Sequence, residues 1–410
     1  MSYRTVEEQL DRVLAAVRRH PPAIVPLDEA RGRVLASDAL AVSAVPVFDN
    51  SAMDGFAVRF DDVANASPDH PVTLRVIADI PAGSALDPAI APGEAARIMT
   101  GSPVPADADA IVPFEDTAGG LADSLATAIV QHAPKALGAH IRRAAEDTAV
   151  GDVVLGTGTL LGPRQIGALA SAGIGRVEVA PRPKVAVVST GSELVSPGQP
   201  LRRGQIPESN SSLLAGLAAE AGAEVVLCRV VDDEGDGPAE AVAEAQRLGA
   251  DAIIFSGGVS AGAYEVVKQS LGDAMEFAKV AMQPGKPQGF GATDDGMLLF
   301  GLPGNPVSAA VSFEVFVRPA LLRLQGRDSI HRPRMLLPAG TDWHTPPGRR
   351  QYLPAVIDRS DPAHPVVRPA TRGGSGSHLS VGLGLAEAYA IVPAETEQVF
   401  VGDLIEVMEL

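Results

Sequence analysis

Short apolar runs alternate with helical segments between residues 184 and 325, and this alternation constrains the fold more than any other feature. The runs are Val185–Val188, Glu224–Val231, Ala252–Phe255 and Met297–Phe300. Helical segments follow three of them, over Ser211–Ala221, Gly237–Leu248 and Pro306–Leu324. Strands that alternate with helices predict a parallel sheet with helices on both faces.

The flanking parts of the chain predict different structures. Residues 5 to about 19 form an amphipathic helix, which Thr5 and Glu8 begin with a capping box. From residue 39 to about 143, short β-like runs are broken by Gly, Pro, Asp and Asn. The same character returns past Pro333. We therefore predict a multidomain α/β protein, with a parallel-sheet α/β domain, β-rich N-terminal modules and a C-terminal β domain.

The composition narrows the classes of function. Apolar residues make up 46% of the 410 residues, which suffices for several cores, and the formal net charge of −17 disfavours non-specific binding to nucleic acid or anionic membranes. The charged N-terminus lacks the apolar core of a signal peptide, so we expect a cytoplasmic protein. The one cysteine, Cys228, excludes an intrachain disulfide, and its apolar neighbours predict a buried strand position.

Four predicted strands end in loops that suit an anion. In an open parallel sheet, ligands bind beyond the carboxyl ends of the strands, where glycine lets backbone N–H groups approach a phosphate. The loops are Ser189-Thr190-Gly191-Ser192-Glu193, Asp232-Asp233-Glu234, Ser256-Gly257-Gly258-Val259-Ser260 with Glu265 and Lys268 beyond it, and Gly301-Leu302-Pro303-Gly304-Asn305-Pro306. Each alone is typical of an ordinary turn, but together they predict an anion pocket rimmed by carboxylates. Oxygen ligands without His or Cys favour Mg²⁺ over Zn²⁺.

Further polar segments lie elsewhere, and none is decisive alone. Lys286 stands between two prolines in Gln283-Pro284-Gly285-Lys286-Pro287, which predicts a positive charge placed on a stiff loop. The other segments are Pro46–Val58 with Asp54, Arg97–Pro105 with Thr100, Arg142–Asp147, Pro347–Arg350 and Ser375–His378. No P-loop occurs, which excludes a Walker-type NTPase.

The order of these segments resembles one known family. The motifs are spread along nearly the whole chain, and in order they are FDNSAMDG, RIMTGSPVP, RRAAED, VAVVSTGSEL, SGGVSAG, QPGKP, GLPGNPVS, PPGRR and GSGSH. They are similar to the motifs of the MoeA family, the molybdopterin molybdenumtransferases, which is related to the E domain of gephyrin. The combination of FDNSAMDG, SGGVS and GLPGNPVS in that order is highly specific.

The resemblance implies an activity and an architecture. Molybdate is inserted into adenylylated molybdopterin with the assistance of Mg²⁺: the anhydride is cleaved, AMP leaves, and the dithiolene ligates molybdenum. The implied parts are an N-terminal helix packing on the α/β domain (1–27), a segmented linker domain (28–41 and 143–178), a β-rich domain (42–142), the α/β molybdopterin-binding domain (179–326) and a C-terminal β-barrel-like domain (327–410). The protein would be a homodimer whose active cleft lies between the α/β domain of one subunit and the β-rich module of the other.

The resemblance also assigns roles to residues at the matching positions. The implied catalytic residues are Asp54, Thr100, Asp147, Glu193 and Asp233, of which Asp54 and Thr100 would act across the dimer cleft. Glu193, Asp233 and Glu265 would hold Mg²⁺, while Lys286 and Arg349 would neutralise phosphate or hold molybdate. The other implied substrate-binding residues are Ser189, Thr190, Gly191, Gly257, Gly258, Ser260, Lys268, Pro303, Gly304, Asn305 and Ser377. Docking with a molybdopterin adenylyltransferase and with recipient molybdoenzymes is a further expectation.

Two positions depart from the usual pattern of the family. Glu265 stands where many members have Asp, and Gln283 stands where many have Lys. The second change removes a positive charge from the expected anion site, for which Lys268, Lys279, Lys286 or Arg350 would compensate.

Two other functions stay open at this point. A molybdopterin adenylyltransferase shares the α/β motifs, but such an enzyme can consist of the α/β domain alone, so FDNSAMDG and RIMTGSPVP argue against it. A non-catalytic scaffold of the gephyrin type would use the same pocket for a protein partner. The carboxylates at Asp54, Glu193 and Asp233 disfavour that interpretation.

Overall fold

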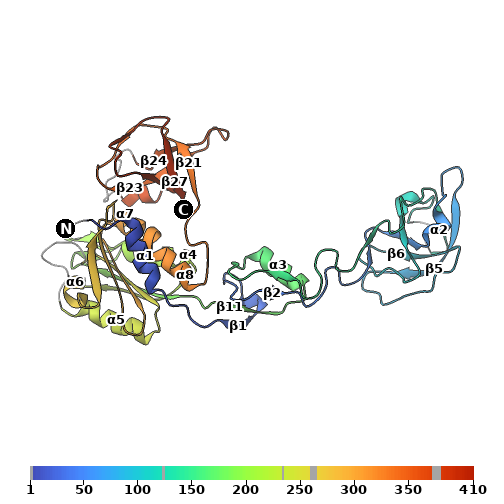
Figure 1. The fold of residues 1–410 in the computed structure, drawn as a ribbon, viewed down its shortest axis with the longest axis horizontal. Coiled ribbons are helices and arrows are strands. Elements are labelled where there is room, and N and C mark those ends of the chain that lie inside the picture. Colours follow the sequence, from blue (N-terminus) through green and yellow to red (C-terminus); the bar gives the residue numbers. More distant parts are fainter. Residues whose placement is uncertain (1–2, 122–124, 233–234, 259–265, 372–379) are drawn as a thin grey trace.

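The computed structural model describes residues 3–121, 125–232, 235–258, 266–371 and 380–410. The chain is elongated, with its parts arranged along one axis (Figure 1). An α/β domain and a C-terminal β domain lie together at one end, a small linker module lies in the middle, and a β-rich module lies at the far end. Among the helices of the described residues, none is long and apolar enough to cross a membrane.

The α/β domain is built on a six-stranded sheet. Its strands, in order across the sheet, are β15 (Glu224–Val231), β12 (Lys184–Thr190), β16 (Ala252–Ser256), β20 (Leu298–Leu302), β19 (Pro287–Ala292) and β17 (Met275–Lys279). The first four are parallel, which confirms the predicted sheet. The last two extend it antiparallel, and the pattern did not predict them. The glycines of β19 suggest a turn, yet Gly289 makes room for the ring of Phe277.

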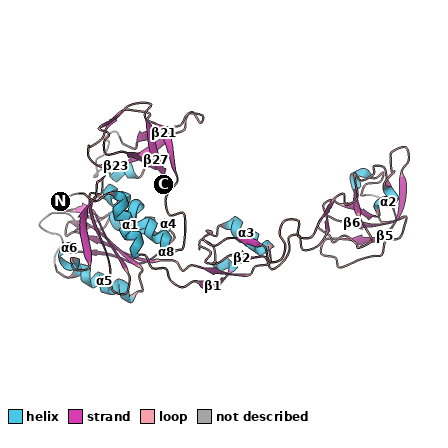
Figure 2. Cartoon of the chain, in the orientation of Figure 1, coloured by secondary structure: helices cyan, strands magenta, loops and turns pink. Residues whose placement is uncertain are grey.

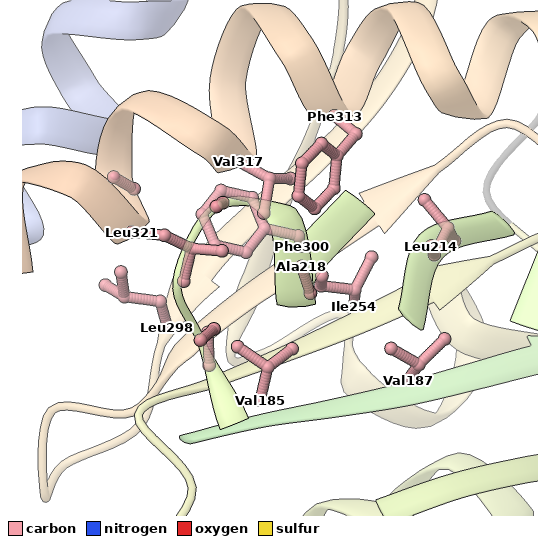
Figure 3. Packing of buried hydrophobic residues seen from close by; sticks show 14 of the residues in the cluster. Val185, Val187, Leu214, Ala218, Ile254, Leu298, Phe300, Phe313, Val317 and Leu321 are labelled. Carbon is pink, nitrogen blue, oxygen red and sulfur yellow. The ribbon is translucent and has the colours of Figure 1, made fainter. Parts of the chain in front are cut away.

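Helices cover both faces of this sheet, as predicted. They are α4 (Asn210–Glu220), α5 (Gly237–Arg247), α6 (Val266–Leu271), α7 (Pro306–Ser312) and α8 (Arg318–Leu324), with a π-helical stretch, Phe313–Val317, joining the last two. On one face, α4, α7 and α8 pack over Val185, Ile254 and Phe300 (Figure 3). On the other face, α5 and α6 pack over Val188 and Phe255. The two cores hold the strands in register.

Cys228 is exposed, so the prediction of a buried cysteine is wrong. The residue lies on β15, which forms one edge of the sheet. The apolar run Val225–Leu227 matches a strand, but an apolar run does not distinguish an edge strand from a central one.

The N-terminal helix α1 (Val6–Ala16) joins two domains. Its capping box is confirmed: the Glu8 backbone N–H donates to Thr5 Oγ1 at 3.1 Å, and the Thr5 N–H donates to the Glu8 carboxylate at 2.8 Å. The helix ends at Ala16, short of the predicted end near residue 19. Val13 is buried in the α/β core, whereas Val6 packs in a cluster that reaches into the C-terminal domain.

The C-terminal domain is a β structure, as predicted. Its main sheet contains β18 (Met282–Gln283), β23 (Arg350–Asp358), β25 (Ala388–Val392), β27 (Leu404–Glu409) and β21 (Arg334–Pro338), with β24 (Val366–Pro369) beside β23. The remaining elements are the pair β22 (Trp343–His344) and β26 (Gln398–Val399), and the short α9 (Ser380–Leu383). Since β18 comes from the α/β part of the sequence, it ties the two domains together.

The linker module is made from two stretches of chain that run out to the β-rich module and back. Its strands are β1 (Ala23–Pro26) paired with β11 (Arg176–Val179), and β2 (Ala39–Leu40) paired with β10 (Val153–Leu155). A 3₁₀ turn over Leu27–Glu29 and helix α3 (Pro163–Ser171) complete it. Leu35, Leu161 and Leu169 are buried in its own small core.

The β-rich module contains a five-stranded sheet. Its order is β7 (Ala110–Pro113), β4 (Gly55–Val58), β6 (Glu94–Ile98), β5 (Val72–Ile80) and β8 (Thr127–Val130). A second pair, β3 (Asn50–Ser51) with β9 (Ile141–Arg142), lies where the chain enters and leaves, and the helical turns are α2 (Phe60–Val63) and a 3₁₀ turn over Phe114–Asp116. Figure 2 shows how strands and loops dominate this end of the molecule.

Gly55 allows β4 to approach β7. A Cβ added to Gly55 would lie 2.0 Å from the backbone oxygen of Val112, so Gly55→Ala would force these strands apart. We expect a loss of about 2 kcal/mol or more in the stability of the module, measured by calorimetry. The control is Gly167→Ala in α3, where a Cβ meets nothing within 4 Å. That variant should melt at or slightly above the wild-type temperature, and wild-type melting of Gly55→Ala would contradict the packing described.

Candidate functional site

The predicted loops meet at one edge of the sheet. Thr190 pairs with Val231, and Ser256 pairs with both Ser189 and Leu302. The four parallel strands therefore end in register, and their loops emerge side by side. The structure thus brings together residues 189–193, Asp232, Gly257, Gly258 and 303–305, as the sequence pattern predicted.

Glycine lets these loops pack backbone against backbone. Gly257 has a φ of +98°, and a Cβ there would lie 2.7 Å from the backbone oxygen of Thr190. Its N–H donates to the backbone oxygen of Leu302 at 3.0 Å. A Cβ on Gly304 would in turn lie 3.5 Å from the Gly257 Cα. The result is a rim of main chain, which is the kind of surface that binds phosphate.

A small strand pair fixes the far side of the loop after β12. β13 (Leu194–Val195) pairs with β14 (Ile206–Pro207) directly after Glu193. The Ile206 N–H donates to the Glu193 backbone oxygen at 2.9 Å. Glu193 itself is exposed at the rim, which suits the role of a metal or substrate ligand.

Buried polar residues that the sequence analysis missed lie beneath the rim. Glu208, Asn210 and Ser211 are each less than a tenth exposed. Asn210 and Ser211 begin α4, and Glu208 lies two residues before it. They contact Ser189 and Ser256, which end two of the strands. The available signal was a polar run, Glu208 to Ser212, directly before a segment of small and apolar residues.

The expected metal ligands are only partly described. Asp233 and Glu265 lie outside the described residues, as do Ser260 and Ser377. Within the described parts of the chain, no three His, Cys, Asp or Glu side chains gather in a way that could hold a metal. Glu193 and Asp232 are exposed at the rim, and their oxygen donors match the chemistry of a hard cation such as Mg²⁺.

The two expected cationic segments meet at the joint between domains. β18 pairs with β23 so that Gln283 lies beside Gln351. The Val280 N–H donates to the Lys286 oxygen at 2.8 Å, and the Arg350 N–H donates to the oxygen of Ala281, the residue after Val280, at 3.1 Å, so the backbones of the two segments lie close together. Arg350 forms an ion pair with Glu7 of α1. The Glu7 carboxylate offsets part of the positive charge that Arg350 would bring to the expected anion site. Lys268 is exposed on α6.

Asp54 and Thr100 form a unit in the β-rich module. The Thr100 backbone N–H and its hydroxyl both donate to Asp54 Oδ1 at 2.7 Å. The backbone bond first, and then the hydroxyl bond, lower the pKa of Asp54 below its ordinary value of 3.8. The carboxylate is therefore an ionised, exposed and well-positioned acceptor.

Asp147 lies near the entrance of the same module. It follows β9, whose partner β3 leads to Asp54, and its backbone N–H donates to the Val45 oxygen at 2.9 Å. Its side chain is exposed. Within one chain, the β-rich module that carries Asp54 and Thr100 lies at the opposite end of the molecule from the α/β domain (Figure 1). The structure therefore forms two groups of expected site residues and does not bring them together in one subunit.

Comparisons with known proteins cover the whole molecule. Three family models match: MoeA N-terminal region (domain I and II) over residues 4–173, "Probable molybdopterin binding domain" over 186–323, and MoeA C-terminal region (domain IV) over 337–410. The chain is 45% identical to molybdopterin molybdenumtransferase 2 of Mycobacterium tuberculosis (strain ATCC 25618 / H37Rv), over 99% of this chain and 100% of the relative. It is 36% identical to molybdopterin molybdenumtransferase 1 of that strain, over 98% of each.

A solved structure has the same fold over its full length. The molybdopterin biosynthesis moeA protein from Pyrococcus horikoshii OT3 aligns with a TM-score of 0.82 and 28% identity, over 100% of both chains. The fold and the rim thus define a multidomain enzyme of molybdenum cofactor biosynthesis. The chain belongs to the MoeA family of molybdopterin molybdenumtransferases.

The hydrogen bonds between Asp54 and Thr100 predict a low pKa for Asp54 that depends on the Thr100 hydroxyl. We expect carboxyl NMR to give Asp54 a pKa below 3.8, and Thr100→Val to raise it because the hydroxyl bond is lost, whereas Thr100→Ser should leave it low. Since the folded pKa is the lower one, ionised Asp54 stabilises the fold above its unfolded pKa. That stabilisation is lost as the pH falls through the folded pKa. Equal pKa values in wild type and Thr100→Val would show that the hydroxyl bond does not form.

Proposed function

We propose that the protein inserts molybdate into adenylylated molybdopterin in a Mg²⁺-dependent reaction that releases AMP. The observation that carries this proposal is the backbone rim at the ends of β12, β16 and β20, with Lys286 at the same edge. Lys286 directly precedes β19, whose Gly289 lies opposite Gly301 of the antiparallel β20. A nucleotide–pterin anhydride and molybdate are both anions, and such a rim offers them N–H groups and positive charge. The match to a molybdopterin-binding domain supports the same substrate.

The backbone N–H groups, the cations and the carboxylates of the site would have different roles in this reaction. N–H groups of the loops after β12 and β16 would hold the phosphates, and the cations of Lys286 and Arg349 would orient molybdate next to the dithiolene. Glu193, with Asp233, would hold Mg²⁺, which supplies charge neutralisation for the phosphoanhydride oxygens when bound. Ionised Asp54 would orient the reacting groups as a hydrogen-bond acceptor.

Asp54 can reach the rim only from a second subunit in this arrangement. We propose a homodimer in which the β-rich module of one chain faces the α/β domain of its partner. An apolar patch on the linker module supports this: Leu40, Val42, Val150 and Val153 are 51%, 65%, 67% and 55% exposed. Leu40 and Val153 are cross-strand neighbours, so their side chains lie next to each other. Burying it against a second copy would remove apolar surface from water.

AMP release tests the proposed reaction. Purified protein is mixed with adenylylated molybdopterin, with molybdate and Mg²⁺ each present or omitted, and AMP is measured by chromatography. We expect release only when both are present, and a loss of at least about 100-fold in Asp54→Ala. Substrate binding without release under any condition would contradict the proposal and favour a scaffold.

A heterodimer tests whether the site is shared. Asp54→Ala and Lys286→Ala chains carrying different tags are co-expressed, and dimers with both tags are purified. If each site uses Asp54 of one chain and Lys286 of the other, one of two sites is intact, and about half of the wild-type activity returns. Homodimers of either variant are the controls. Inactive heterodimers would show that each site lies within one chain.

A further inference from the structure

The first turn of α4 joins two of the strand-end loops through one side chain. Asn210 Nδ2 donates to Ser256 Oγ at 2.6 Å and to the backbone oxygen of Gly304 at 2.6 Å. Ser256 ends β16, and Gly304 lies in the loop after β20. Both hydrogens of the amide are thus used to hold the loops of two neighbouring strands together.

A second side chain ties the carboxyl end of β12 to the same turn. Glu208 accepts from the Ser189 hydroxyl at 2.8 Å and from the Ser211 backbone N–H at 2.8 Å. The hydroxyls of Ser189 and Ser211 also lie 2.9 Å apart. Glu208 is 6% exposed and Asn210 is 8% exposed. These bonds are therefore made away from water, where hydrogen bonds are stronger.

Burying this polar network costs more free energy than filling the same space with apolar side chains. A buried carboxylate and a buried amide both cost free energy unless they are fully bonded. Here Asn210 Oδ1 and Thr190 Oγ1 are buried without a partner among the described residues. Polar groups kept at such a cost are typical of sites that serve function rather than stability.

We propose that Glu208 and Asn210 are positioning residues that hold the three loops at the spacing needed to bind the phosphate of the nucleotide. The inference rests on the proposed function, because it concerns the same rim. Neither side chain touches the substrate. They set where the main chain at Thr190, Gly257 and Gly304 stands, and Glu208 does so through hydrogen-bond geometry rather than through its charge.

Three variants separate the roles of the Asn210 donors, of the bonds that Glu208 accepts, and of the charge of Glu208. Asn210→Asp keeps the shape but removes both donors and turns a carboxylate toward the Gly304 oxygen. Glu208→Ala removes both accepted bonds, whereas Glu208→Gln keeps an oxygen that can accept them. The matched control is Gln325→Glu, because buried Gln325 likewise donates to two backbone oxygens, those of Ala221 and Leu321, at the other end of α4.

The measurements are KM and kcat for AMP release, AMP affinity by calorimetry, and hydrogen exchange of the strand-end loops. We expect Asn210→Asp and Glu208→Ala to raise KM and weaken AMP binding about 10-fold, the effect of losing two hydrogen bonds. Exchange should become faster around residues 189–191 and 256–258. Glu208→Gln should stay within about 3-fold of wild type, and Gln325→Glu should lower the melting temperature with an unchanged KM.

Several results would overturn the inference. Unchanged KM, AMP affinity and loop exchange in folded Asn210→Asp or Glu208→Ala would make the network an ordinary part of the core. Equal losses in Glu208→Gln and Glu208→Ala would show that Glu208 acts by charge. If Asn210→Asp does not fold, the comparison of Glu208→Ala with Glu208→Gln tests the proposal without it. A wild type that binds AMP but releases none refutes the proposed function only, since the AMP affinities and the exchange rates still test the positioning.

Discussion

The parallel register of β15, β12, β16 and β20 is the constraint on which the rest of the site depends. Loops that are far apart in the sequence share one edge only because their strands end level with one another. The two apolar cores on either face of the sheet maintain that register. Glycine at position 257 then lets the loops touch through their backbones. The proposed phosphate binding would therefore depend on sheet packing as much as on any charged side chain.

The linker module gives the molecule its second constraint. It carries the Asp54–Thr100 unit away from the rim, so a single chain holds two incomplete groups of site residues (Figure 1). An exposed apolar patch on the same module offers a surface for a second copy. The elongated shape separates the Asp54–Thr100 unit from the rim within one chain. In the proposed dimer, the same shape would let the Asp54–Thr100 unit of one chain meet the rim of the other.

Much of this could be predicted from the sequence, and the exceptions have physical causes. Periodicity located β12, β15, β16 and β20 because these strands are short apolar runs with turn residues at their ends. It missed β19, since glycine in a strand resembles a turn until its neighbour Phe277 is known. The apolar run around Cys228 predicted a buried residue, but the residue is exposed on an edge strand. Whether a strand lies at the edge depends on the order of strands in the sheet, which the strand's own sequence does not show. Glu208 and Asn210 were missed since their partners are distant in sequence. The motifs assigned Asp54 to the expected site. Its place in the β-rich module, away from the α/β domain, is why we propose that a second subunit supplies it.

A crystal structure of the dimer with AMP, Mg²⁺ and molybdate would show whether the site is completed between two subunits. We expect the AMP phosphate on the loops after β12, β16 and β20 of one chain, with the second chain's copy of Asp54 facing it across the cleft. A nucleotide held by one chain alone, with both copies of Asp54 far from it, would show that the site is not shared.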